Sequence, residues 1–171
     1  MPISSPNPTL RLASLLSLLT PTERRERNLR LVQLHNFLLD LPHSRFHMPR
    51  WCSADATEES CGTAGCAAGW AATKFHHLGF RLDSIQRPLF GRFPEFDGFQ
   101  GTLAFAWFFG LTGDEAQKIT NDFASYIRDY GVQPEHLTPA MVADRIARIL
   151  LSSYGIDVHT TSVEPLPSLT T

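Results

Sequence analysis

The sequence of 171 residues lacks a long hydrophobic run and contains only three cysteines. So few cysteines, and an odd number of them, argue against the disulfide framework of a small secreted domain, and we expect a reduced, cytoplasmic protein. The leucine-rich stretch at residues 10–20 is shorter than the roughly 20 apolar residues of a membrane span. It also lacks the charged start and the cleavage site of a signal peptide, so we expect no membrane contact and no processing.

The sequence has no excess of positive charge either. It contains 15 lysines and arginines against 17 aspartates and glutamates, which gives a net charge of −2. Proteins that bind a nucleic-acid backbone need a surplus of basic residues, so this balance argues against nucleic acid as a partner.

Sustained alternation of apolar and polar residues, the pattern of strands, is also missing, whereas helix signals are strong. Residues 20–41 begin with Thr20, Pro21 and Glu23, a capping box, and continue with leucines at heptad spacing. Similar helices are predicted over 112–130 and 138–154, and the wholly apolar "GTLAFAWFFG" at 101–110 predicts a buried central helix. The sequence therefore predicts an all-α fold, a compact single-domain bundle of five or six helices around that central helix.

The two ends of the chain are rich in proline, serine and threonine. This composition predicts disordered termini at residues 1–9 and 156–171, which flank a helical domain at 10–155.

Residues 80–99 are predicted to form a long loop in which phenylalanines alternate with arginines. Such a loop can seal the core, but aromatic anchors with arginine at their edge are typical of protein interfaces. The residues predicted to bind another protein, or a second copy of the chain, are Phe90, Arg92, Phe93 and Phe96.

The stretch "ESCGTAGCAAGWAA" at residues 59–72 carries the only motif-like pattern. If residues 62–78 form one helix, its small residues recur three and four positions apart and let another helix approach closely. Glycine inside a helix costs about 1 kcal/mol against alanine, so packing or function must offset it. The favoured interpretation is structural, and the residues of this packing motif are Gly62, Gly65, Cys66, Gly69 and Trp70.

Two chemical interpretations of the same stretch stay open. Cys61 at a helix N-terminus, with His47 or His136 as its base, is the arrangement of a thiol-dependent hydrolase, although Glu58 and Glu59 would raise the pKa of the thiol. The "CG" followed by small residues resembles papain-like and C39-type cysteine peptidases over about ten residues. The second alternative is a small structural zinc site, for which the candidate ligands are His47, Cys52, Cys61 and Cys66. Neither a cofactor nor a metal is favoured.

The segments "FHMPRWCSADATEESCGTAGCAAGWAA", "FGLTGDEAQKI" and "LTPAMVADRIARIL" together resemble a group of small phage and bacterial proteins of unknown function. The resemblance covers roughly residues 30–150 and implies a fold and a phage or bacterial context without an activity. Members of that group carry histidine or tryptophan at the position of Trp70, and an indole can neither bind a metal nor shuttle a proton. We therefore expect a non-enzymatic accessory or regulatory protein that works by binding another protein.

Overall fold

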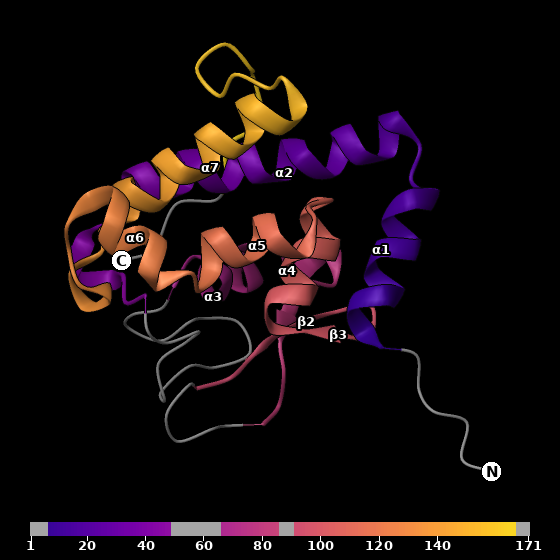
Figure 1. The fold of residues 1–171 in the computed structure, drawn as a ribbon, viewed down its shortest axis with the longest axis horizontal. Coiled ribbons are helices and arrows are strands. Elements are labelled where there is room, and N and C mark those ends of the chain that lie inside the picture. The colour runs from indigo at the N-terminus through magenta and orange to yellow at the C-terminus, as the bar shows by residue number, and fades with distance from the viewer. Residues whose placement is uncertain (1–6, 49–65, 86–90, 167–171) are drawn as a thin grey trace.

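A computed structural model describes residues 7–48, 66–85 and 91–166 of the chain (Figure 1). These residues form seven α-helices and one three-stranded sheet. The prediction of a predominantly helical domain is confirmed, but the prediction of an all-α fold with five or six helices is wrong.

The helices and strands have the following bounds. The α-helices are α1 Pro8–Leu18, α2 Pro21–Asp40, α3 Ala67–Lys74, α4 Gly101–Phe109, α5 Gly113–Thr120, α6 Phe123–Tyr130 and α7 Pro139–Tyr154. Short 3₁₀ helices cover His43–Arg45, His76–Leu78 and Pro134–His136. The strands are β1 Arg81–Leu82, β2 Pro94–Phe96 and β3 Phe99–Gln100.

The predicted helix starts are confirmed at three threonines. Thr20 and Thr112 each accept a hydrogen bond from the backbone N–H three residues later, and the glutamate at that position bonds back to the threonine. Thr138 accepts from the N–H of Met141 at the start of α7. These side chains satisfy backbone donors that have no partner inside the helix.

The single helix predicted over 112–130 is interrupted, and this prediction is wrong. Asn121 ends α5, and the Asp122 side chain accepts from the N–H of Ser125 to cap the new helix α6. In the new helix α6, the apolar side chain of Ile127 is 38% exposed.

Residues 80–99 were predicted to be a loop, but the three strands of the sheet lie within residues 81–100. β2 pairs with β1 and with β3 in antiparallel fashion, and Phe96 is opposite Phe99. Only Asp97 and Gly98 connect β2 to β3, with φ angles of 51° and 77°. Asp-Gly is the preferred sequence for a two-residue hairpin turn, because both positions need a positive φ. The signal was present in "FDGF" at 96–99.

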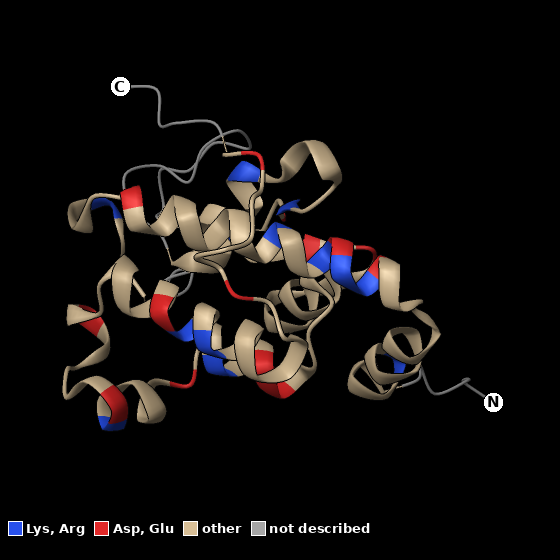
Figure 2. Ribbon diagram, turned by 90° about the horizontal axis from the view of Figure 1, so that it is seen from above, with Lys and Arg blue, Asp and Glu red and all other residues tan. Residues whose placement is uncertain are grey.

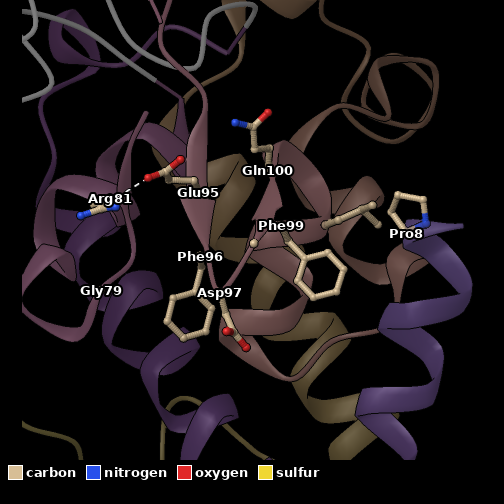
Figure 3. A pocket seen from close by; sticks show the side chains of 10 residues that line it. Pro8, Gly79, Arg81, Glu95, Phe96, Asp97, Phe99 and Gln100 are labelled. Atoms are coloured by element: carbon tan, nitrogen blue, oxygen red, sulfur yellow. Dashed lines mark hydrogen bonds and ion pairs between the residues drawn. The ribbon is translucent and has the colours of Figure 1, made fainter. Parts of the chain in front are cut away.

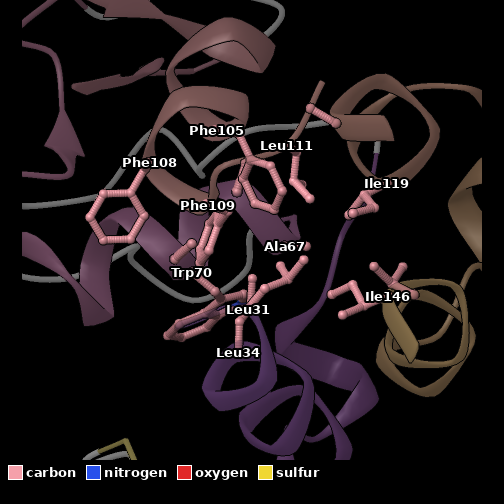
Figure 4. Packing of buried hydrophobic residues seen from close by; sticks show 14 of the residues in the cluster. Leu31, Leu34, Ala67, Trp70, Phe105, Phe108, Phe109, Leu111, Ile119 and Ile146 are labelled. Carbon is pink, nitrogen blue, oxygen red and sulfur yellow. The ribbon is translucent and has the colours of Figure 1, made fainter. Parts of the chain in front are cut away.

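The central helix α4 is buried as predicted. The rings of Phe105, Phe108 and Phe109 point from α4 into the core beside α2 and α3 (Figure 4). Phe108 stacks on Phe80 with ring centroids 4.7 Å apart, and it meets Phe75 at 5.3 Å. This aromatic cluster joins α3 and the start of the sheet to α4.

The first half of α2 carries charges of both signs, yet it contacts the core (Figure 2). Its polar side chains cover the C-terminal end of α4: Asn28 donates to the carbonyl of Phe109 at 2.9 Å, and Arg27 donates to that of Trp107. Arg30 donates to the carbonyl of Phe108 at 3.4 Å. The last carbonyls of a helix lack partners and carry partial negative charge, so these donors stabilise the end of α4.

The helices α2 and α7 also lie side by side (Figure 1). The chain after α7, assigned to the tail by its composition, packs on the domain as far as it is described. Ile156 and Val158 are buried, and the Gln33 side chain of α2 donates to the carbonyl of Glu164.

Candidate partner-binding surface

The residues predicted to bind a partner fall in different environments. Phe93 and Phe96 are partly exposed, while Phe90 lies outside the described residues. Arg92 is only 8% exposed, and its guanidinium donates to the carbonyls of Asp83 and Leu82. Arg92 therefore holds two segments of the sheet together, instead of presenting its charge at the edge of an interface.

Phe96 lies at the rim of a pocket of about 770 Å³. We call it the hairpin pocket, because residues of β2, the turn and β3 form most of its lining (Figure 3). The charged, aromatic and amide side chains that line it are those of Arg81, Glu95, Phe96, Asp97, Phe99 and Gln100. Of these six residues the sequence pattern indicated only Phe96, since the other five come together only when the hairpin forms.

The hairpin turn is fixed from two directions. On one side the indole Nε1 of Trp107 donates to Oδ2 of Asp97 at 2.9 Å. On the other side Arg11 of α1 places its guanidinium 4.7 Å from the centroid of the Phe99 ring and donates to the Asp97 carbonyl at 3.4 Å. The pocket is consequently held in shape by α1 and α4 before any ligand arrives.

The polar groups of the hairpin pocket are suited to recognition. Arg81 pairs with Glu95 at 2.9 Å, and their side chains are 69% and 29% exposed. An exposed pair of this kind contributes about 1 kcal/mol or less to stability, so exchanging it for contacts with a ligand costs little. Among the described residues, those that line the pocket include no cysteine, histidine or serine.

The cysteine stretch differs from its prediction. The helix begins at Ala67 with Cys66 as N-cap, not at residue 62. The place of Cys61 before a helix, and the stripe that Gly62 and Gly65 would share with Gly69, stay predictions. The positions of Cys52, Cys61, Gly62 and Gly65 lie outside the described residues.

Cys66 has the environment of a structural residue. Its side chain is buried, and this burial raises the pKa of the thiol to about 11, although the backbone N–H groups of Gly69 and Ala68 act in the opposite direction. A thiol with such a pKa is almost entirely protonated at neutral pH and is a poor nucleophile.

Gly69 and Trp70 are buried in α3 as the packing interpretation requires. The Trp70 indole donates to the carbonyl of Arg45 at 2.9 Å, and its ring lies 5.8 Å from that of Phe37. Trp70 thus connects α3 to α2 and to the chain that follows α2.

The structure describes the two candidate bases, His136 and His47, but not the candidate nucleophile Cys61. His136 is exposed at the end of a 3₁₀ helix, and His47 is partly buried, with Nδ1 unpaired among the described residues. Within residues 7–48, 66–85 and 91–166 no group of three or more His, Cys, Asp or Glu side chains could hold a metal ion. The zinc alternative involves Cys52 and Cys61, so it stays a prediction.

No model of a known protein family, no curated protein and no solved structure matches this chain. The resemblance to phage and bacterial proteins and the shorter one to cysteine peptidases stay predictions. None of the helices described is both long and apolar enough to cross a lipid bilayer.

Proposed function

We propose that this chain is a small non-enzymatic accessory or regulatory protein that works by binding another protein through the hairpin pocket. The observation that carries the proposal is a preformed pocket in which partly exposed Phe96 lies beside exposed polar groups. Aromatic side chains surrounded by polar ones are the usual anchors of protein interfaces.

The charge of the pocket indicates the chemistry of the partner. Among the described residues, its charged lining residues are Arg81, Glu95 and Asp97, so carboxylates outnumber cations. We expect the partner to insert an apolar side chain against Phe96 and to place a basic or amide group near Asp97 and Gln100.

Site-specific photocrosslinking in cells of the source organism tests this function. A photoreactive amino acid at Gln100, which is exposed and lines the pocket, should give one dominant protein adduct. The same group at Arg25, which is exposed on α2, is the matched control and should not give it. The adduct is identified by mass spectrometry.

The identified protein is then purified and titrated against the wild-type chain and the Glu95→Lys variant. We expect tight binding to the wild type and weaker binding to the variant, because lysine replaces a negative charge of the pocket and repels the basic group of the partner. Equal affinity for both chains, or adducts that are the same at Gln100 and Arg25, would show that the hairpin pocket is not the binding surface.

A further inference from the structure

A second pocket, of about 600 Å³, lies between α6, α7 and the C-terminal end of α5. None of the described residues that line it also lines the hairpin pocket. We call it the α6–α7 groove, and we define it by Lys118, Arg128, Arg145, Arg148, Ile149 and Leu151. On α7 its residues recur three and four positions apart, so they form one face of that helix.

Arg145 forms the floor of the α6–α7 groove, and its guanidinium already has hydrogen-bond partners within the protein. It is 5% exposed, and its guanidinium donates to Asp129 at 2.7 Å, to the carbonyl of Lys118 at 3.0 Å and to the Ser125 hydroxyl. It also stacks on Tyr126, with Cζ 3.7 Å from the ring centroid. Arg145 therefore shapes the groove and joins three helices.

The rim carries cations that have donors to spare. The Lys118 ammonium is exposed and pairs with no carboxylate among the described residues. The side chain of Arg128 is 74% exposed and uses its Nε for Asp129, and that of Arg148 is 55% exposed and uses one nitrogen for Asp144 and Tyr130. The other N–H groups of these guanidiniums remain available to a ligand.

The local charge is opposite to that of the whole chain. Four cations line the groove together with two aspartates, Asp122 and Asp129, whereas the chain carries a net charge of −2. The hydrogen bond from Arg128 and the charges of Arg128, Arg145 and Arg148 lower the pKa of Asp129 below its ordinary value. The field in this groove thus stabilises negative charge.

An apolar contact point lies in the same groove. Leu151 is 58% exposed, and Ile149, two residues before it, is partly exposed. A ligand that fits has anionic groups and at least one apolar group.

We propose that the α6–α7 groove binds an acidic segment of a protein partner, with carboxylates on Lys118, Arg128 and Arg148 and an apolar side chain on Leu151. A small anion fits less well, because the buried cation Arg145 already has its partners and the free donors are spread over α5, α6 and α7. A polypeptide can place separate carboxylates on all three rim cations. This surface is additional to the hairpin pocket and does not depend on it.

Fluorescence anisotropy with a synthetic probe tests the proposal on the full chain. The probe is a labelled peptide in which glutamates flank a central leucine, and inorganic phosphate serves as a competitor. We expect binding that weakens as salt is added, and that weakens by roughly tenfold or more in the Lys118→Glu variant, since a cation at the rim becomes an anion. Leu151→Ser should weaken it several-fold, and lysines in place of the probe's glutamates should abolish it.

Two variants control for general effects of charge and hydrophobicity. Arg25→Glu and Leu18→Ser change exposed residues of the same types outside the groove, and they should bind the probe as the wild type does. All four variants change exposed side chains, and unchanged melting temperatures will show that the fold is intact.

Absence of binding to the glutamate probe overturns the proposal, as does equal binding by Lys118→Glu and wild type. Displacement of the probe by inorganic phosphate, together with no effect of Leu151→Ser, would instead identify a site for small anions and would also overturn it. None of these results bears on crosslinking from Gln100, so the two surfaces are tested separately.

Discussion

The indole of Trp107 donates a hydrogen bond of 2.9 Å to the carboxylate of Asp97, and this bond connects the hairpin turn to the central helix. The same indole is stacked on Arg27 of α2, with Cζ 3.9 Å from the ring centroid. The position of the hairpin pocket is consequently coupled to the packing of α2 on α4, and substitutions along this chain of contacts should affect both.

Replacing Asp97 tests how far the turn stabilises the fold. Asp97→Ala removes the acceptor for Trp107 and places alanine at a φ of 51°, which non-glycine residues other than Asn and Asp rarely adopt. We expect the free energy of unfolding to fall by about 1–2 kcal/mol in urea titrations. Asp97→Asn keeps an acceptor and tolerates this conformation, so it should lose much less; equal losses would contradict the account.

Asn28 offers a test of the cap on α4. Its side chain is 1% exposed and donates to the carbonyl of Phe109. Asn28→Leu leaves that carbonyl without its side-chain donor at a buried helix end, and we expect a loss of about 1–3 kcal/mol. Arg25→Ala, on an exposed position of the same helix, should stay within about 0.5 kcal/mol of wild type. Thermal or urea unfolding of the two variants distinguishes a specific cap from a general effect on α2.

Replacement by alanine should affect stability differently at two glycines that lie at the ends of neighbouring helices. Gly110 has a φ of +71°, and a Cβ there would lie 3.1 Å from Cβ of Arg27. Gly110→Ala should therefore destabilise the protein by about 1–2 kcal/mol, the usual cost of the left-handed conformation. A Cβ at Gly113 meets nothing within 4 Å, so Gly113→Ala should be neutral or mildly stabilising. Equal melting temperatures for both variants would refute this reading of Gly110.

Much of the helical fold could be predicted because its signals are local. The caps at Thr20, Thr112 and Thr138 depend on residues within one turn, and they lie where the sequence placed them. Leu31, Leu34 and Leu38 of α2 are buried, as are residues 104–109 of α4, as their patterns indicate. Patterns of this kind need no knowledge of the tertiary contacts.

The wrong predictions, one long helix over 112–130 and a loop over 80–99, have physical reasons that lie in competing or very short local signals. Asp122 can cap a new helix, and this preference overrode the apolar periodicity that ran through Asn121. The sheet has strands of two or three residues, too short for alternation to be visible, so only the Asp97-Gly98 turn could have revealed it.

The hairpin pocket and the α6–α7 groove were missed for another reason. Arg81 and Gln100 are far apart in sequence, as are Lys118 and Arg148, and nothing in either residue's neighbours indicates the partner. Such residues line one pocket because of the way α4 and α7 pack in the folded protein, and no local sequence pattern encodes that packing.

The burial of the Cys66 thiol can be tested by chemical labelling. In a Cys52→Ser/Cys61→Ser background Cys66 is the only cysteine, and it is buried at the start of α3. We expect an aromatic disulfide reagent to modify it at neutral pH only as fast as the protein opens. Guanidinium chloride should therefore accelerate the reaction in parallel with unfolding, and rapid labelling of the native chain would contradict the burial.

The pH dependence of stability gives a second measurement on the same residue. Burial raises the pKa of the Cys66 thiol from an ordinary 9.0 to about 11, so the folded state holds the proton more tightly than the unfolded state. The stability due to this group is complete below pH 9.0 and is lost as the pH rises toward about 11, with a slope of up to about 1.4 kcal/mol per pH unit. Cys66→Ala cannot ionise, so its free energy of unfolding should fall less over that window. Identical slopes for the two chains would show that the Cys66 thiol does not ionise differently in the folded and unfolded states.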